Sequence, residues 1–477
     1  MLLLLQCCCC CLKARFGHML VVLAMLPTKF LEKRVLNYLK PRLIAPLASS
    51  APSRSMSQNT ASAPVIKPAK RLDVLEPSVW IEFTGLVRKH KPVNLGQGLP
   101  DFATPKILSD ALYTTQGDNT VHLNQYTRSQ GHPRLVNAIA NLYGPMFNRQ
   151  LNPLTEVITT VGGYEALYCL FTSMIDEGDE VIMIEPFFDC YLPMTRLAGG
   201  VPVCVPLRAK PGAKSSADLY LDKEELENAF SDKTKAIVVN TPHNPTGKVF
   251  SRDELEFLAS LCKKHNVLYI SDEVYEWIVY DGKEHIRMAT LPGMWDRTVT
   301  VCSAGKTFSI TGWKIGWAIG PEDLISNCSA IHAQSIYTMA TPLQEALAQA
   351  IEHEIKLLGT KDSYWKWMAD TLFAKRNQLV DMVKAAGMVP IIPEGGYFMM
   401  ADVSPLKKEF EDDGSGDTYD VRFAKWLLKE KGLATIPVGP FYSKEHRDLA
   451  RNYTRFCFIK EDDTMQKAEE ILKNLSI

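Results

Sequence analysis

The sequence predicts an α/β protein with an open sheet and crossover helices, and three observations lead to this class. Short, almost uniformly apolar runs alternate with segments of helical period from about residue 95 to residue 320. Runs of this kind are typical of strands buried on both faces of a parallel sheet. The chain has 477 residues, enough for two or three domains. Its composition, 46% hydrophobic and 22% charged, is that of a globular protein.

The expected strands follow one another along the chain, and each ends at small or polar residues. They are Val157–Val161, Val181–Glu185, Ala236–Asn240, Leu268–Ser271, Val299–Cys302 and Ile315–Ile319. Helical segments separate them. One of these is Arg252–His265, where Glu254, Glu256 and Lys263 occupy the polar positions.

The pattern changes after about Ala346. Two long helical segments are expected there, Leu343–Leu358 and Ser363–Ala386, followed by the short strands Tyr397–Asp402 and Phe456–Ile459. We therefore expect four parts: a basic leader over residues 1–60, an N-terminal arm over 61–94 that joins the small domain, a large domain over 95–345, and a small α+β domain over 346–477.

The leader indicates a compartment. Residues 1–60 carry eight basic side chains and one acid, and they end in a stretch rich in Ser, Ala and Pro. This composition is typical of a mitochondrial transit segment, so we expect a mitochondrial protein. The alternatives are a cytoplasmic form that starts at Met56 and a secretory signal. The signal would lack its usual basic start, because the first basic residue is Lys13.

Composition also argues against several classes of protein. The net charge of -1 disfavours a nucleic-acid binder, and no run of 18 purely apolar residues predicts a membrane span. The seven cysteines beyond the leader are dispersed and show no C-x-x-C spacing. They are expected to be buried thiols rather than a disulfide framework or a zinc site, and no metal site is expected.

Ligands in open α/β sheets bind at the carboxyl ends of the strands, so the residues there are candidates for a site. Gly162-Gly163-Tyr164 opens a helix whose N–H groups could face an anion, although a plain tight turn is the alternative. Phe188 could stack on a flat ring or pack in the core. Asn244, with a proline on each side, has its amide free to donate.

Three later strand ends carry charge. An Asp272 carboxylate at the end of an apolar strand needs a cation, either an Arg or Lys or a protonated heterocycle. Tyr275 could point the same way. Lys306 follows a buried strand and Ser303; burial lowers a lysine pKa and makes its amine nucleophilic, while a surface lysine is the alternative. Lys314 would neutralise a phosphate.

Together these groups fit one ligand. They comprise an anion cradle, a stacking ring, an amide and a phenol for a ring oxygen, a carboxylate for a ring nitrogen, and an amine for an aldehyde. That combination matches pyridoxal 5'-phosphate.

Several motifs resemble those of a known family. Asn240-Thr-Pro-His-Asn-Pro-Thr-Gly247, Ser271-Asp-Glu-Val-Tyr275 and Ser303-Ala-Gly-Lys-Thr-Phe-Ser-Ile-Thr-Gly-Trp-Lys-Ile-Gly316 resemble the class I/II aminotransferases of fold type I. Four further segments resemble the kynurenine aminotransferases, also known as glutamine transaminase K and cysteine-S-conjugate β-lyase. They are Asn94-Leu-Gly-Gln-Gly-Leu-Pro-Asp-Phe102, Leu123-Asn-Gln-Tyr126, Glu185-Pro-Phe-Phe-Asp-Cys-Tyr191 and Glu394-Gly-Gly-Tyr-Phe398. The resemblance covers the chain from about Arg71 onward. It implies a mostly parallel seven-stranded sheet between helices and a smaller α+β domain.

The resemblance implies a role for each candidate that would hold the cofactor. Lys306 would be the catalytic residue, bonding to the cofactor aldehyde and later carrying the proton. Asp272 would pair with the ring nitrogen, and Phe188 would stack on the ring. Tyr275 and Asn244 would bond the ring oxygen. The residues expected to hold the phosphate are Gly163, Tyr164, Ser303 and Lys314.

The resemblance also implies how substrate is bound. Arg455 would grip the α-carboxylate as a two-pronged clamp. Asn244 would contribute to the same site, and the residues expected to line the pocket are Trp80, Gly98 and Tyr337. Tyr126 would reach cofactor and substrate from a second subunit, which implies a homodimer with shared active sites. Two departures stand out: the broad class usually has Arg at the place of Lys314, and the narrower family often has Phe-His at Tyr337-Thr338.

The implied activity is a ping-pong transfer of the amino group of kynurenine to a 2-oxo acid, giving kynurenic acid. Glutamine and aromatic or sulfur-containing amino acids are further expected donors. Small amino and 2-oxo acids are the expected partners, with neither nucleic acid nor membrane. Three alternatives remain open: β-elimination or another reaction with the same cofactor, a serine acyl hydrolase suggested by the S-x-x-K pattern of Ser303 and Lys306, and a non-catalytic binding module.

Overall fold

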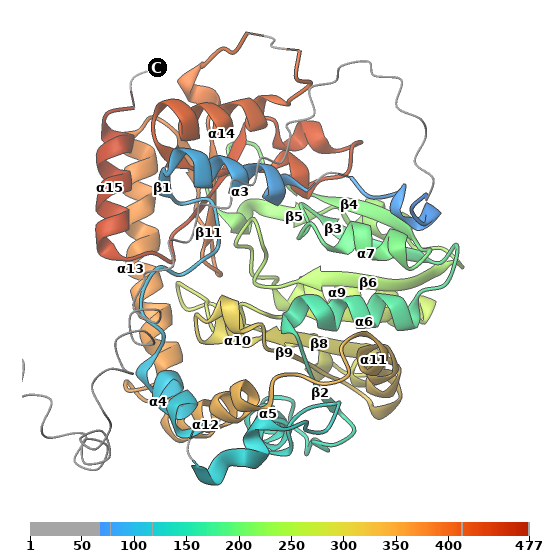
Figure 1. Ribbon diagram of the computed structural model, residues 1–477. Coiled ribbons are helices and arrows are strands. Elements are labelled where there is room, and N and C mark those ends of the chain that lie inside the picture. Colours follow the sequence, from blue (N-terminus) through green and yellow to red (C-terminus); the bar gives the residue numbers. More distant parts are fainter. Residues whose placement is uncertain (1–66, 77, 117, 412–413, 476–477) are drawn as a thin grey trace, which may run out of the picture. The chain divides into compact units, whose positions relative to one another are not determined.

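A central sheet of eight strands dominates the computed structural model, which describes residues 67–76, 78–116, 118–411 and 414–475. The strand order is β2-β9-β8-β7-β6-β3-β4-β5 (Figure 1). The strands are β2 (Val157–Thr160), β3 (Glu180–Glu185), β4 (Val201–Ala209), β5 (Leu219–Leu221), β6 (Thr234–Asn240), β7 (Leu268–Asp272), β8 (Thr298–Ser303) and β9 (Gly316–Ile319). Only β9 and β5 run against the other strands.

The predicted α/β class and the mostly parallel sheet are confirmed, but the sheet has one strand more than expected. The extra strand is the short β5, which pairs antiparallel with the far end of β4 through Leu207, Arg208 and Ala209. The sequence reading had identified neither β4 nor β5.

Helices cover both faces of this sheet, because consecutive strand residues point to opposite faces and both faces are apolar. Val181 and Met183 pack under one helical layer, while Ile182 and Ile184 pack under the other. The first layer contains α6 (Gly162–Met174), α7 (Tyr191–Leu197) and α11 (Glu322–Ser335); the second contains α8 (Lys223–Asn228) and α9 (Arg252–His265). The bounds of α9 agree with the prediction, and its start is fixed by a capping box between Ser251 and Glu254.

A group of helices packs beside strand β2 at one edge of the sheet. It consists of α4 (Lys106–Thr114), α5 (Pro133–Met146) and α12 (Thr341–Leu357). A one-turn helix, α10 (Ala304–Thr307), follows β8 directly and carries Lys306.

A second, antiparallel sheet has the order β10-β11-β14-β13. Its strands are β10 (Val389–Ile391), β11 (Phe398–Asp402), β13 (Ile436–Pro437) and β14 (Tyr453–Cys457). The helices packed around it include α13 (Tyr364–Ala385), α14 (Tyr419–Glu430) and α15 (Asp462–Lys473).

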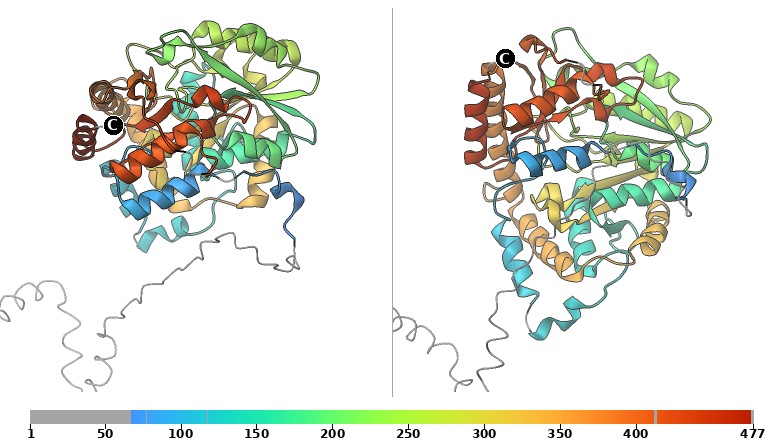
Figure 2. Two further views of the ribbon diagram at one scale, coloured as in Figure 1. Left: turned by 90° about the horizontal axis from the view of Figure 1, so that it is seen from above. Right: turned by 45° about the horizontal axis from the view of Figure 1, so that its top comes forward.

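The first described helix packs against this C-terminal part of the chain. Helix α3 (Val79–His90) lies alongside α14, and β1 (Val93–Asn94) pairs in parallel with β12 (Leu433–Ala434) (Figure 2). As a result, Trp80 on α3 lies near Arg455 of β14, and Gly98, which follows β1, lies against Phe398 of β11.

From Pro68 onward the described residues form one compact unit, so the four domain bounds given above stay predictions. The basic leader over residues 1–60 lies outside the described residues. Among the helices that are described, none is both long and apolar enough to cross a lipid bilayer.

Candidate active site

One cavity of about 220 Å³ lies where the carboxyl ends of the large-sheet strands meet the second sheet. All the predicted site residues except Tyr126 and Tyr337 line it. The lining residues that had been predicted are Trp80, Gly98, Gly163, Tyr164, Phe188, Asn244, Asp272, Tyr275, Ser303, Lys306, Lys314 and Arg455. The strand order explains the convergence, because β3, β6, β7 and β8 are neighbours and end at the same edge.

Lys306 supplies an amine to this cavity. It lies on α10, directly after the buried strand β8. Its Nζ is 5.4 Å from the centre of the Tyr397 ring and 5.8 Å from that of Tyr275. Burial lowers the pKa of Lys306 to about 8. Much of this amine is therefore neutral near pH 8, which is the state that attacks a carbonyl carbon.

Asp272 supplies a carboxylate at the end of β7, the strand next to β8. It is buried, and burial raises its pKa to about 6. The hydroxyl of Tyr191 opposes that effect by donating a hydrogen bond of 2.5 Å to Oδ2 of Asp272. Near neutral pH the group is a buried anion that gains stability from any cation brought beside it.

Two asparagines connect β6 with β7. The Asn240 side chain donates to the backbone oxygen of Asp272 (2.9 Å) and accepts from the backbone N–H of Asn244 (2.7 Å). This pair orients Asn244, whose Oδ1 accepts from Arg455 (2.9 Å). No hydrogen bond within the described residues occupies Nδ2 of Asn244, so it is available as a donor in the cavity.

The start of helix α6 forms an anion cradle. Its N-cap, Val161, provides no side-chain cap for the first N–H groups, and Gly162, Gly163 and Tyr164 at the helix start line the cavity. Gly162 has φ +73°, and a Cβ there would lie 3.4 Å from Nζ of Lys314. A Cβ on Gly316 would lie 2.4 Å from the backbone of Gly162 and Gly163. The cradle thus combines backbone donors, a lysine ammonium and close backbone packing that tolerates no side chain at Gly316.

Arg455 occupies the opposite side of the cavity. It is 1% exposed, and burial lowers its pKa to about 10. Besides its bond to Asn244, it donates to the backbone oxygen of Gly96 (3.0 Å), while its Nε has no partner among the described residues. Its guanidinium carbon lies 3.9 Å from the ring centre of Phe398 and 5.4 Å from that of Trp80. A buried cation between aromatic rings is suited to a carboxylate ligand.

Four residues that shape this site had no predicted role. Tyr191 bonds Asp272, Asn240 orients Asn244, Phe398 lies against Arg455, and Asp189 accepts a 2.6 Å hydrogen bond from the Trp80 indole. Three of them stand inside or at the end of the Glu185–Tyr191 and Glu394–Phe398 segments quoted above. Their position in these segments was the only sequence feature that pointed to a role in the site.

Tyr126 and Tyr337 lie outside the cavity of their own chain. They are 82% and 57% exposed and contact each other edge to face, with ring centres 5.4 Å apart. Their predicted roles, including a reach into a second subunit, stay predictions.

The fold and the cavity together define an enzyme that transfers an amino group between small acids. The chain belongs to the family "Aminotransferase class I and II", whose model matches residues 90–472. Curated relatives carry a common name. The human kynurenine--oxoglutarate transaminase 3 is 49% identical over 412 residues, which are 86% of this chain and 90% of the relative. The human kynurenine--oxoglutarate transaminase 1 is 45% identical over 416 residues, which are 86% and 98%.

Solved structures agree on the fold. An N-succinyldiaminopimelate aminotransferase from Mycobacterium tuberculosis matches with a TM-score of 0.77 and 34% identity, over 86% of this chain and all of that one. The aspartate aminotransferase of Thermus thermophilus with maleate matches with a TM-score of 0.74 and 29% identity, with the same coverage. One fold therefore accommodates very different amino acids, so the fold alone does not determine donor preference.

Proposed function

We propose that this chain is a pyridoxal 5'-phosphate-dependent aminotransferase that moves the amino group of kynurenine to a 2-oxo acid, which yields kynurenic acid from kynurenine. Glutamine and aromatic or sulfur-containing amino acids are proposed as further donors. The names of the curated relatives support kynurenine, and the apolar rings of Trp80 and Phe398 beside the cavity suit a flat side chain.

One observation carries the proposal. Asp272 ends β7, Lys306 follows the neighbouring strand β8, and both residues line the same cavity. The start of α6 lines this cavity as well. This donor set fits the cofactor: an amine for the aldehyde, a buried anion for the ring nitrogen, and backbone N–H groups with Lys314 for the phosphate. When bound, the cofactor supplies an electrophilic aldehyde and a ring that accepts the electron pair released at the substrate Cα.

The chain's own residues perform the remaining work. With the cofactor bound, the amine of Lys306 would act as the base that takes the proton from the substrate Cα and as the acid that gives it back. Asp272 keeps a proton on the ring nitrogen. Arg455 holds the carboxylate of the incoming amino acid, and in the second half-reaction it holds that of the 2-oxo acid, which gives ping-pong kinetics.

The proposal also covers the oligomeric state, the cellular compartment and a second possible reaction. The unit is a homodimer in which Tyr126 completes the site of the partner subunit, which is in keeping with its 82% exposure. The proposed compartment is the mitochondrion, to which the basic leader would direct the chain; the alternative is a cytoplasmic form that starts at Met56. The alternative reaction is β-elimination of cysteine S-conjugates, which would release the thiol and, after addition of water, pyruvate and ammonia.

The decisive test removes the Lys306 amine. We expect Lys306→Ala to fold and to lose at least about 10³-fold in kynurenic acid formation, because the proton carrier is gone. Lys366→Ala is the matched control, since Lys366 is a surface residue paired with Asp370. Borohydride reduction of the wild-type holoenzyme, followed by peptide mass mapping, should place the pyridoxyl adduct on Lys306. Full turnover by the alanine variant, or an adduct elsewhere, would overturn the proposal.

A further inference from the structure

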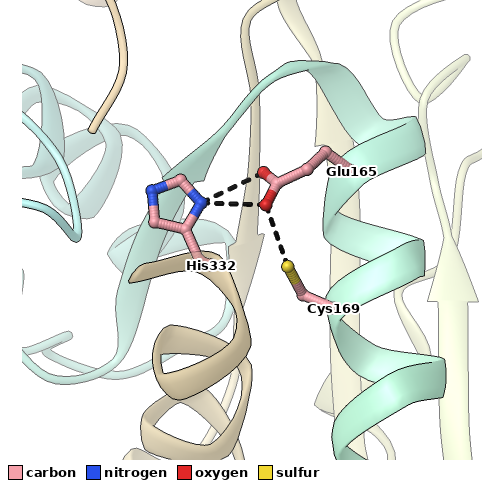
Figure 3. Close-up of side chains that lie close together, drawn as sticks. All are labelled: Glu165, Cys169 and His332. Carbon is pink, nitrogen blue, oxygen red and sulfur yellow. Dashed lines mark hydrogen bonds and ion pairs between the residues drawn. The ribbon is translucent and has the colours of Figure 1, made fainter. Parts of the chain in front are cut away.

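Two helices of one layer bring metal-ligating side chains together in the interior. Glu165 and Cys169 are four residues apart on α6, and Cys328 and His332 are four residues apart on α11. The two helices pack against each other. Because residues four apart share a helix face, each helix presents a pair of possible ligands to the other. Figure 3 shows Glu165, Cys169 and His332 pointing toward one another.

The distances suit a small cation. Nδ1 of His332 lies 3.0 Å and 3.1 Å from the two carboxylate oxygens of Glu165, and Sγ of Cys169 lies 2.9 Å from Oε1. All three ligand types lie within 4.8 Å of one another. Around a tetrahedral zinc ion with bonds of about 2.0–2.3 Å, ligand atoms are about 3.3–3.8 Å apart. The ligand atoms of Glu165, Cys169 and His332 would each have to move by less than about 1 Å to reach these separations.

The histidine is already oriented for this role. Its Nε2 lies 3.0 Å from the backbone oxygen of Ser129. A carbonyl oxygen only accepts, so Nε2 carries the hydrogen and donates it. This bond leaves Nδ1 as the atom that faces Glu165. Metal-binding histidines are typically held in the same way, with the distal N–H on a backbone carbonyl or a carboxylate.

The cluster is buried and contains groups that become anionic ligands when they lose a proton. Cys169, Cys328 and His332 are fully buried, and the Glu165 side chain is 12% exposed. Cys328 lies within hydrogen-bonding reach of the Cys169 thiol. Binding would release to solvent the thiol protons of the cysteine ligands and the proton shared by His332 and Glu165, and the dication would offset the negative charge left on the ligands.

We propose that Glu165, Cys169 and His332 bind a thiophilic divalent cation of the zinc type, with the adjacent Cys328 as the fourth ligand. Mixed sulfur, nitrogen and oxygen donors in tetrahedral reach are typical of zinc sites. None of the four side chains lines the active-site cavity. The site is therefore structural: it joins α6 to α11. It also fixes Glu165, whose Oε2 accepts from the backbone N–H of Val161 at the start of the cradle helix (3.0 Å).

The test uses the full-length holoenzyme with Cys7–Cys11 replaced by serine, so that the leader contributes no thiols. After dialysis against a weak chelator, the protein is titrated with Co²⁺ and separately with Zn²⁺. We expect one Co²⁺ per chain, a sulfur-to-cobalt charge-transfer band, tetrahedral d–d bands at longer wavelength than the cofactor absorbs, and displacement by Zn²⁺. Zn²⁺ should raise the melting temperature by several degrees.

Cys169→Ser and His332→Gln should bind Co²⁺ at least about tenfold more weakly. Cys262→Ser removes a buried thiol on α9, away from the cluster, and should bind as the background protein does. The proposed site is refuted if all three variants bind Co²⁺ with equal affinity. It is also refuted if the background protein shows no sulfur-to-cobalt band, a result that does not depend on whether any of these variants folds. An unchanged spectrum in Cys328→Ser overturns the assignment of the fourth ligand.

Discussion

The hydroxyl of Tyr191, at the start of α7, donates a 2.5 Å hydrogen bond to the carboxylate of Asp272, at the end of β7. Both side chains are buried. After burial itself, this bond is the largest influence on the Asp272 pKa, and it acts in the opposite direction. Tyr191 therefore helps to keep Asp272 ionised at neutral pH.

Tyr191→Phe should move the Asp272 pKa above its value of about 6. A hydrogen bond worth about 1 kcal/mol corresponds to a little under one pKa unit. Since only the ionised carboxylate attracts the ring cation, the affinity of apoenzyme for pyridoxal phosphate should fall as pH drops through about 6, and in the variant through a higher pH. Absorbance titrations of apoenzyme between pH 5 and 8 would show this, and identical curves for the two proteins would contradict it.

The lowered pKa of Lys306 predicts how fast apoenzyme takes up its cofactor. The neutral amine is the reactive form, so the uptake rate should rise with pH up to about 8 and then level off. A lysine with the ordinary pKa of about 10.4 would give a rate that still rises at pH 9.5. Stopped-flow absorbance after mixing apoenzyme with cofactor separates the two cases.

Asp272→Asn should stabilise the apoprotein while it damages function. The folded pKa of about 6 is above the ordinary aspartate value of 3.8, so this carboxyl costs no stability below pH 3.8, and the cost grows as pH rises to about 6. Above that pH the cost reaches at most about 3 kcal/mol. We expect a higher apoprotein melting temperature for the variant at pH 7.5, a smaller gain at pH 4.5, and transamination reduced by at least about 10²-fold. A variant less stable than wild type at pH 7.5 would refute this.

Gly316→Ala should disrupt the cradle by a backbone clash, because the new Cβ would lie 2.4 Å from the backbone of Gly162 and Gly163. Overpacking against backbone costs roughly 1–3 kcal/mol or more. We expect a lower melting temperature and at least tenfold weaker cofactor binding. Gly312→Ala, four residues earlier, is the control: its Cβ would meet nothing within 4 Å. Equal melting temperatures and equal cofactor affinities of the two variants would show that a side chain at position 316 is tolerated.

The sequence was sufficient for those parts of the site that follow strands. Asp272 and Lys306 each end an apolar run, and neighbouring parallel strands bring such residues together. Tyr191 was not assigned, because its partner lies 81 residues further along the chain and no local pattern marks the pair. The Glu165–His332 contact spans 167 residues, so cysteine spacing alone gave no sign of the proposed metal site.

Strand β4 was missed for a different reason. Pro202 and Pro206 interrupt it, and proline usually argues against a strand because it has no N–H to donate. Both are tolerated because, among the described residues, β5 pairs only with Leu207, Arg208 and Ala209, so no strand pairs with this edge of β4 beside the prolines. The prolines thus lie where the strand edge is unpaired, which becomes apparent only once the pairing is known.

In the structure Arg455 donates hydrogen bonds to Asn244 and to the backbone oxygen of Gly96, and this has a consequence for amines that lack an α-carboxylate. An α-amino acid exchanges these neutral acceptors for a carboxylate and gains a charge-assisted pair. A decarboxylated amine offers no such exchange and would leave the guanidinium in its resting bonds. We therefore expect biogenic amines to be poor substrates even when their side chains match those of the amino-acid substrates.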